Sequence, residues 1–132
     1  MGSTQPIAAV PPSFERILLV EDNPVIAMNT EALLQELGAG KVMVAMSLSV
    51  ALDLASAHRF DIAILDLDLD GETSVPVAQR LLAARVPIIF STGYGDLGDL
   101  PNELGKVPLL RKPYTFTDLK KIILQTSGAD QD

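Results

Sequence analysis

Short, mostly apolar runs recur along this chain, and each is followed by a longer segment in which apolar residues return every three or four positions. The runs lie at 17–20, 42–46, 62–65, 87–91 and 109–111. A strand that is apolar at successive positions is buried on both faces, as in a parallel sheet with helices packed on each side. The pattern therefore predicts an α/β domain built from repeated βα units.

The segments between these runs carry signals for the ends of helices. Pro24 stands where a first helix would begin, and Gly38 is typical of its end. Ser47 is suited to cap a second helix, because its hydroxyl can accept a hydrogen bond from a backbone N–H of the first turn. Helical spacing of apolar residues also predicts helices over 75–85 and 117–125.

One connecting segment breaks the alternation. The glycines and prolines of 92–108 allow at most a short helix near 101–104. Residues 1–14 show no periodicity and are predicted to be a flexible tail, and 127–132 a second one. The folded part is therefore expected to be 15–126, with no output domain after it.

Composition limits the classes of function. The 132 residues suffice for one domain with an apolar core, and the chain has no cysteine and a net charge of -7. That charge disfavours binding to nucleic acid or anionic lipid, which depends on basic residues. No apolar run reaches the roughly 20 residues that span a bilayer, and the N-terminus lacks a signal-peptide layout. A cytoplasmic protein is expected.

Charged and hydroxyl side chains follow four of the predicted strands. These residues are Glu21, Asp22, Asp66, Thr92 and Lys112. Because ligands of open parallel sheets bind beyond the carboxyl ends of the strands, we expect these side chains to converge. Crowded carboxylates repel unless a cation neutralises them, and a hard cation such as Mg²⁺ suits oxygen ligands. A carboxylate can accept a phosphoryl group, and in the run Asp66, Asp68 and Asp70 only Asp66 directly closes an apolar strand.

Four stretches of sequence carry a resemblance to a known family. They are ILLVEDNP, DIAILDLDL, PIIFSTGY and LLRKPY. In order and spacing they resemble the signature stretches of receiver domains, the phosphorylated modules of two-component response regulators. The resemblance covers about 15–126. It implies a flavodoxin-like doubly wound (βα)5 fold, with a parallel sheet in the strand order 2-1-3-4-5.

The resemblance also implies how a phosphoryl group would be received. Asp66 is the expected phosphoacceptor, and its donor is a sensor histidine kinase or a histidine phosphotransfer protein. Thr92 and Lys112 are expected to bind phosphoryl oxygens, and the Lys112–Pro113 peptide bond is expected to be cis. Such a domain catalyses its own phosphorylation and dephosphorylation but acts on no separate substrate.

The family resemblance further implies a metal site and an output surface. Mg²⁺ would be held by Asp22, Asp66 and the backbone carbonyl of Asp68, with Glu21 acting through water. A downstream protein would bind the face formed by the fourth-helix segment, the fifth strand and the last helix. A phosphorylation-dependent homodimer is a further expectation for that face.

Four positions depart from or qualify the family pattern. Asp70 replaces a usual proline, which predicts a more mobile and more acidic loop. Leu109 replaces the aromatic residue whose rotation normally reports phosphorylation. The stretch FSTGYGD instead resembles a subgroup with a Phe-Ala-Thr-Gly-Tyr-like motif, found in stand-alone alphaproteobacterial regulators and attached to some sensor kinases. Tyr94 is then a candidate replacement switch, and Asp68 and Tyr94 are candidate tuners of phosphate lifetime.

Several competing interpretations start from the same residues. Asp68 and Asp70 resemble the nucleophile loop of haloacid-dehalogenase-like phosphatases, but that enzyme would leave Glu21 and Asp22 unexplained. The EF-hand pattern that begins at Asp66 fails because its last ligand position holds Val77. The glycine pattern GxGxxG at 93–98 follows the fourth strand and precedes no clear helix. His58 is expected to end a helix, where its charge favours the dipole.

Three functional classes fit a receiver domain of this length. The first is a stand-alone signalling module that acts by protein contact. The second is a phosphate sink or shuttle in a relay. The third is a receiver excised from a hybrid kinase.

Overall fold

The computed structural model describes residues 14–93 and 100–127 and contains a five-stranded parallel sheet. The strands of this sheet are β1 (Arg16–Val20), β2 (Lys41–Ala45), β3 (Ile62–Asp66), β6 (Ile88–Thr92) and β7 (Leu109–Arg111). Their spatial order is β2-β1-β3-β6-β7. Because β6 and β7 are the fourth and fifth strands of this sheet along the chain, the predicted order 2-1-3-4-5 is confirmed.

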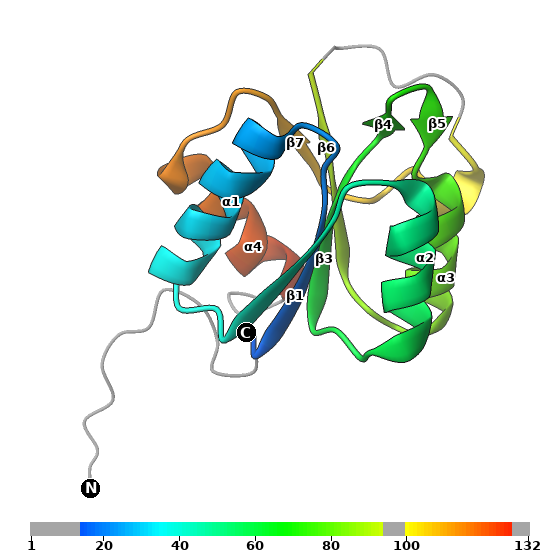
Figure 1. Cartoon of the computed structure of the whole chain (residues 1–132), viewed down its shortest axis with the longest axis horizontal. Helices are drawn as coiled ribbons and strands as arrows, with labels where there is room; N and C mark the ends of the chain where they lie inside the picture. The colour runs from blue at the N-terminus through cyan, green and yellow to red at the C-terminus, as the bar shows by residue number, and fades with distance from the viewer. Residues whose placement is uncertain (1–13, 94–99, 128–132) are drawn as a thin grey trace, which may run out of the picture.

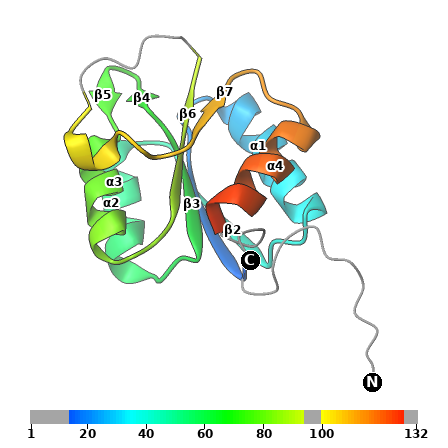
Figure 2. The same ribbon diagram turned by 180° about the vertical axis from the view of Figure 1, so that it is seen from behind.

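Helices cover both faces of the sheet. In the described part of the chain they are α1 (Pro24–Glu36), α2 (Leu48–Ala57), α3 (Val75–Ala83) and α4 (Phe116–Ser127), with one 3-10 turn, η1 (Asn102–Leu104). Figure 1 shows α1 and α4 on one face and α2 and α3 on the other, and Figure 2 shows the same layers from behind. The doubly wound α/β fold is therefore confirmed, with a single 3-10 turn near the predicted short helix.

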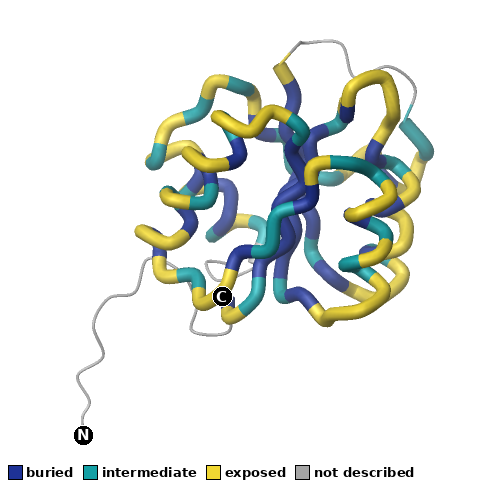
Figure 3. The backbone as a smooth tube through the Cα atoms, in the orientation of Figure 1, coloured by how far each residue is buried: buried dark blue, intermediate teal, exposed yellow. Residues whose placement is uncertain are grey.

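The alternation of side chains along each strand divides the core into two layers. On β1, Ile17 and Leu19 pack toward α1 and α4, while Leu18 and Val20 pack toward α2 and α3. All four are at most 1% exposed. In Figure 3 the central strands are drawn as buried along most of their length. Apolar residues at successive strand positions are thus explained by burial on both faces.

Side-chain caps set the beginnings of the first two helices. The Asn23 side chain accepts hydrogen bonds from the backbone N–H groups of Val25 and Ile26, at 2.9 and 3.1 Å. Ser47 accepts one from Val50 at 3.3 Å, so the predicted cap of α2 is confirmed. These caps fix the direction in which each helix leaves the carboxyl edge of the sheet.

A hairpin follows β3 that the sequence interpretation did not predict. Strands β4 (Asp68–Leu69) and β5 (Glu72–Thr73) pair antiparallel across a two-residue turn. Asp70 and Gly71 both have positive φ, 54° and 91°, as the turn of a tight hairpin requires. Proline is locked near -65° and cannot adopt this conformation. At the position where the family usually has proline, this loop therefore has a backbone conformation that Asp70 can adopt and proline cannot.

The ends of the other elements differ from the prediction by a few residues. Helix α3 ends at Ala83, two residues early, and Arg85 turns the chain with a φ of 65°. Helix α4 continues to Ser127, past the predicted boundary of 126. Phe14, assigned to the predicted tail, is 4% exposed and packs in the layer below α1 and α4.

Candidate functional site

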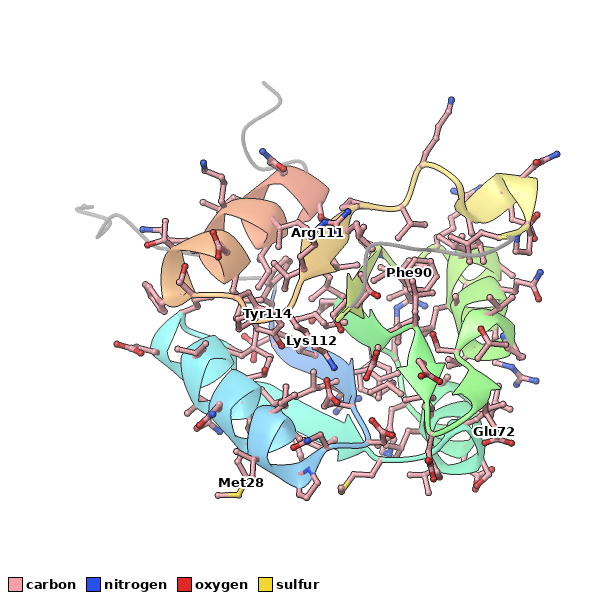
Figure 4. All side chains as sticks on the ribbon, turned by 90° about the horizontal axis from the view of Figure 1, so that it is seen from above. Met28, Glu72, Phe90, Arg111, Lys112 and Tyr114 are labelled. Atoms are coloured by element: carbon pink, nitrogen blue, oxygen red, sulfur yellow. The ribbon has the colours of Figure 1, made fainter. Side chains whose placement is uncertain are left out.

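Three acidic side chains meet at the carboxyl edge of the sheet. Glu21 and Asp22 follow β1, and Asp66 ends β3, the neighbouring strand. Each offers a carboxylate oxygen, and these oxygens lie within 4.8 Å of one another. The expected convergence of these three residues is thus present in the structure, and Figure 4 looks down on this edge.

Asp66 is held by hydrogen bonds to both of its carboxylate oxygens. Its Oδ1 accepts the backbone N–H of Asp68 at 3.2 Å, and its Oδ2 accepts from Lys112 Nζ at 2.9 Å. The residue is 5% exposed. These contacts fix the carboxylate at the mouth of the site and keep the negative charge partly neutralised.

Lys112 joins the two most buried acids. It follows β7, and its Nζ lies 2.7 Å from Glu21 Oε1 and 2.9 Å from Asp66 Oδ2. Its backbone N–H donates to the carbonyl of Thr92 at 2.8 Å, and its peptide bond to Pro113 is cis. Burial lowers the pKa of Lys112, but the hydrogen bonds to Glu21 and Asp66 outweigh burial, so its pKa is raised. The ammonium is therefore charged throughout the neutral range.

Glu21 is the most buried of the acids, at 1% exposed. Besides the ion pair with Lys112, its Oε2 accepts the backbone N–H of Asn23 at 3.1 Å. Burial nevertheless raises its pKa, and the charge of Asp66 adds to the rise, against the opposing effect of Lys112 and Asn23. The ionised form of Glu21 is thus energetically unfavourable in this position, and a further cation beside it would make its ionisation less unfavourable.

The predicted hydroxyl also lies at this edge. Thr92 ends β6, which is paired with β3, and is 7% exposed. At the next residue, Gly93, no heavy atom of the described residues lies within 4 Å of the position of an added Cβ. The described part of the chain therefore leaves room at the end of β6, next to the strand that carries Asp66.

Of the predicted switch and tuning residues, the structure describes Asp68 on β4 and Leu109 on β7. Asp68 is exposed, and its Oδ1 accepts the backbone N–H of Gly71 at 3.1 Å, which ties the carboxylate to the hairpin. Leu109 is half-buried on β7 and packs against the core layer of α2 and α3. Tyr94 lies outside the described residues.

Two polar residues beside the site were not predicted to contribute to it. The hydroxyls of Thr30 on α1 and Tyr114 after β7 lie 2.5 Å apart. Thr30 is 1% exposed, and burial raises the pKa of Tyr114, partly offset by the Thr30 hydrogen bond. The available signal was a threonine at an apolar position of α1, since a buried hydroxyl needs a partner.

The donor set at this edge suits a hard divalent cation. Three carboxylates within reach of one another provide oxygen ligands, and Lys112 supplies only one compensating positive charge. Mg²⁺ prefers oxygen donors and keeps some of its waters. The residues present therefore fit a magnesium site.

Comparison with known proteins agrees with this geometry. The family model of the response regulator receiver domain matches residues 17–124. The chain belongs to this family. The match includes every residue of the carboxyl-edge cluster. The haloacid-dehalogenase alternative, by contrast, finds no support in these comparisons, and the exposed Asp70 lies at the tip of the hairpin.

Named relatives show where receiver domains of this kind occur. The phyllosphere-induced regulator PhyR of Methylorubrum extorquens is 33% identical over 115 residues, which cover 83% of this chain and 42% of PhyR. The chain spans about half the length of the curated relatives that it matches first. A solved structure, SdrG from Sphingomonas melonis Fr1, is 34% identical with a TM-score of 0.74, covering 92% of this chain and 98% of SdrG.

A further solved structure bears on the metal. The receiver domain of the sensor histidine kinase PA1611 from Pseudomonas aeruginosa PAO1 has a magnesium ion coordinated in its active-site cleft. It is 30% identical to this chain, covers 88% of it and 99% of its own length, and has a TM-score of 0.75.

In the part of the chain that the structure describes, no helix is long and apolar enough to cross a membrane.

Proposed function

We propose that this domain receives a phosphoryl group on Asp66 and so acts as a switch in a two-component phosphorelay. The observation that carries the proposal is the position of Asp66, which ends the central strand beside Glu21 and Asp22 and is paired with Lys112. These are the elements that phosphoryl transfer to a carboxylate requires: a fixed nucleophile, a metal site and a cation for the transferred charge.

The proposed transfer starts from a phosphohistidine on a sensor kinase or phosphotransfer protein. A carboxylate oxygen of Asp66 attacks phosphorus, the P–N bond to the donor histidine breaks, and that nitrogen regains its electron pair and takes up a proton. The product is an acyl phosphate. Water later attacks phosphorus, which returns the Asp66 carboxylate and releases inorganic phosphate.

Mg²⁺ fits this step through its ligands. Asp22, Asp66 and the backbone carbonyl of Asp68 would hold it, with Glu21 reached through water. When bound, Mg²⁺ neutralises the clustered carboxylates and the charge on the phosphoryl oxygens. Glu21 has a second part in this proposal, because its ion pair at 2.7 Å keeps Lys112 at the site.

Lys112 and Thr92 would stabilise the transferred group. Lys112 Nζ is 2.9 Å from Asp66 Oδ2, so a small movement brings the ammonium to a phosphoryl oxygen. Thr92, on the neighbouring strand, would offer its hydroxyl to another oxygen of the group. Phosphorylation therefore changes the partners of both residues, which is how a local charge event biases a surface.

The outer face of α1 is the proposed docking surface for the donor. Val25 and Met28 are 65% and 69% exposed on this helix, and α1 begins directly after Glu21 and Asp22. Figure 4 shows Met28 pointing outward from α1 at the edge of the molecule. A helix of the donor packed here would cover this apolar surface and bring its histidine toward Asp66.

The proposed output face is formed by η1, β7 and α4. A groove of about 450 Å³ runs between β7 and α4, lined by charged residues such as Arg111, Asp118 and Lys121. A downstream protein, or a second copy of the chain, would bind this face. A partner that binds only the phosphorylated form would favour the stand-alone class over the phosphate sink or shuttle, and a longer parent gene would indicate the hybrid-kinase class.

Three residues are proposed to set how the phosphoryl group is reported and lost. Leu109 leaves β7 without the usual aromatic reporter, so Tyr94 would take that role, as in the Phe-Ala-Thr-Gly-Tyr-like subgroup. Asp68 and Tyr94 would tune phosphate lifetime. The contact of Asp68 with Gly71 supports a fixed rather than a free carboxylate at this position.

Incubation with acetyl phosphate and Mg²⁺, followed by intact mass spectrometry, tests the proposed function. We expect the wild type to gain one phosphoryl group, and we expect none with Asp66→Asn or when EDTA removes the metal. The exposed Asp70→Asn serves as the matched control and retains uptake. A wild type that gains no phosphate, or an Asp66→Asn protein that gains as much as wild type, contradicts the proposal.

A further inference from the structure

We propose that Tyr114 is a positioning residue, whose hydrogen bond to Thr30 on α1 holds Lys112 in place at Asp66. This inference rests on the proposed function, because it assigns a regulator to the lysine of the phosphoacceptor site. It extends that function by connecting the proposed donor-binding helix to the cation that serves the transferred group.

The geometry places a second tie between α1 and the segment after β7. The first tie is the ion pair between Glu21, just before α1, and Lys112. The second is the 2.5 Å contact between the hydroxyls of Thr30 and Tyr114. Thr30 lies in the second turn of α1, and Tyr114 lies two residues after Lys112. The segment from Lys112 to Tyr114 is therefore held against α1 at both of its ends.

Between the two ties lies a groove of about 410 Å³. Lys112, Pro113 and Tyr114 line one side of it, and α1 lines the other with Ile26, Asn29, Thr30 and Leu33. Figure 4 shows Lys112 and Tyr114 together between α1 and β7. Tyr114 also packs against the core layer of α1 and α4, so its hydrogen bond to Thr30 adds to this packing in limiting the movement of the segment.

Because Thr30 is buried, its hydrogen bond favours the position of Tyr114 that the structure shows. Thr30 is 1% exposed, so its hydroxyl loses a partner if Tyr114 moves away, and an unsatisfied buried hydroxyl is costly. Burial raises the pKa of Tyr114 further above its ordinary value, and the protonated phenol can donate or accept the bond at neutral pH. A change in α1, such as donor binding, is thereby transmitted to Lys112.

Two variants remove the bond with little change in shape. Tyr114→Phe deletes the phenol oxygen, and Thr30→Val deletes the other hydroxyl, whereas Thr30→Ser keeps it. Thr126→Val is the matched control, because Thr126 also donates a hydrogen bond, to the Ile122 carbonyl at 2.7 Å, but at the far end of α4. All variants are compared at a temperature at which circular dichroism shows each to be folded.

The first readout needs no phosphorylation. Brief treatment with acetic anhydride labels only unprotonated amines, and peptide mass spectrometry gives the extent at each lysine. We expect Lys112 to label between about threefold and tenfold faster in Tyr114→Phe and Thr30→Val, the range that one net hydrogen bond corresponds to. The exposed Lys41 and Lys121 are internal references, and Thr30→Ser and Thr126→Val should match wild type.

The second readout is the rate of phosphorylation by acetyl phosphate at saturating Mg²⁺. We expect it to fall by about threefold to tenfold in both variants, with no further fall in the double variant, because both remove the same interaction. The affinity for Mg²⁺ should stay unchanged, since the carboxylates hold the metal.

Unchanged Lys112 labelling in a folded Tyr114→Phe protein overturns the inference, as does a Thr30→Ser protein that behaves like Thr30→Val. A parallel loss of Mg²⁺ affinity also overturns it, because the whole acidic edge would then have been disturbed. If the wild type takes up no phosphate while Lys112 labelling responds as expected, the proposed function fails and the positioning of Lys112 by Tyr114 stands.

Discussion

The two loops on either side of Asp66 are built in different ways. The loop after β3 closes on itself as the β4–β5 hairpin, where Asp68 accepts the backbone N–H of Gly71 three residues away. The loop after β7 is held by distant parts of the chain: Lys112 pairs with Asp66, 46 residues earlier, and Tyr114 contacts Thr30, 84 residues earlier.

The two loops therefore contribute to the site in different ways, one to its stability and the other to its charges. The turn of the hairpin is formed by Asp70 and Gly71 alone, so changes at these two residues should alter stability and leave the charges around Asp66 in place. The segment after β7 carries a cation to two buried acids, so changes there should alter the reaction itself. Three substitutions test this division, beginning with the largest expected effect.

Replacing Lys112 with methionine should have the largest effect. The variant keeps an unbranched side chain, shorter by the terminal atom, and removes the positive charge that lies 2.9 Å from Asp66. We expect phosphorylation by acetyl phosphate to slow by about 10²- to 10³-fold, the range for losing one preorganised electrostatic group. The initial rate, measured by intact mass, checks this. Asp70→Asn in the hairpin is the comparison. A Lys112→Met protein whose phosphorylation rate lies within a few-fold of the Asp70→Asn rate would contradict the proposed difference between the two loops.

Replacing Gly71 with alanine should act on stability. Gly71 has a φ of 91°, and no atom lies within 4 Å of an added Cβ, so the cost comes from the backbone conformation alone. We expect a loss of about 1–2 kcal/mol in the free energy of unfolding, measured by urea denaturation. Gly105→Ala is the matched control, because Gly105 has an ordinary φ of -67° and should change little. Equal effects at the two glycines would show that the hairpin turn is not under this constraint.

The smallest effect concerns the pH dependence of stability. Because the pKa of Glu21 is raised by burial, its contribution to stability is present below its usual value of 4.5 and is lost as the pH rises through the raised pKa. The contribution of the raised pKa of Lys112 is fully present below 10.5 and is lost only above it, so it does not vary across the acidic and neutral range. In EDTA, we therefore expect wild type to lose stability relative to Glu21→Gln between pH 4.5 and neutrality. Thermal melts of both proteins measure this difference. If wild type instead gains stability relative to the variant across that interval, the prediction is contradicted.

Sequence reasoning recovered the parts of this structure that depend on pattern. Apolar runs predict strands because both faces of the sheet are buried, and the strand ends locate Glu21, Asp22, Asp66 and Lys112 because parallel strands share an edge. The Asp-Gly pair of the hairpin was also visible in the sequence, but Asp70 was interpreted only as a replacement of the family's proline. An Asp-Gly pair between two strands is the strongest sequence signal for a short hairpin.

Contacts between residues that lie far apart in the sequence could not be predicted from it. Nothing in the helical pattern of α1 says which residue will meet the hydroxyl of Thr30, because that depends on how the segment after β7 crosses the helix. The direct pairing of Lys112 with Glu21 was likewise not predicted, since both had been assigned to ligands rather than to each other. Such pairs follow from packing in three dimensions.

The identity of the phosphorylated residue is the central claim, and the chemical trapping of the acyl phosphate tests it directly. Borohydride reduces an aspartyl phosphate to homoserine, so the protein is phosphorylated with acetyl phosphate and Mg²⁺, reduced, digested and sequenced by mass spectrometry. We predict homoserine at position 66, with unmodified aspartate at 68 and 70. Homoserine at 68, or at no position in a protein that has gained phosphate, would contradict the assignment of Asp66.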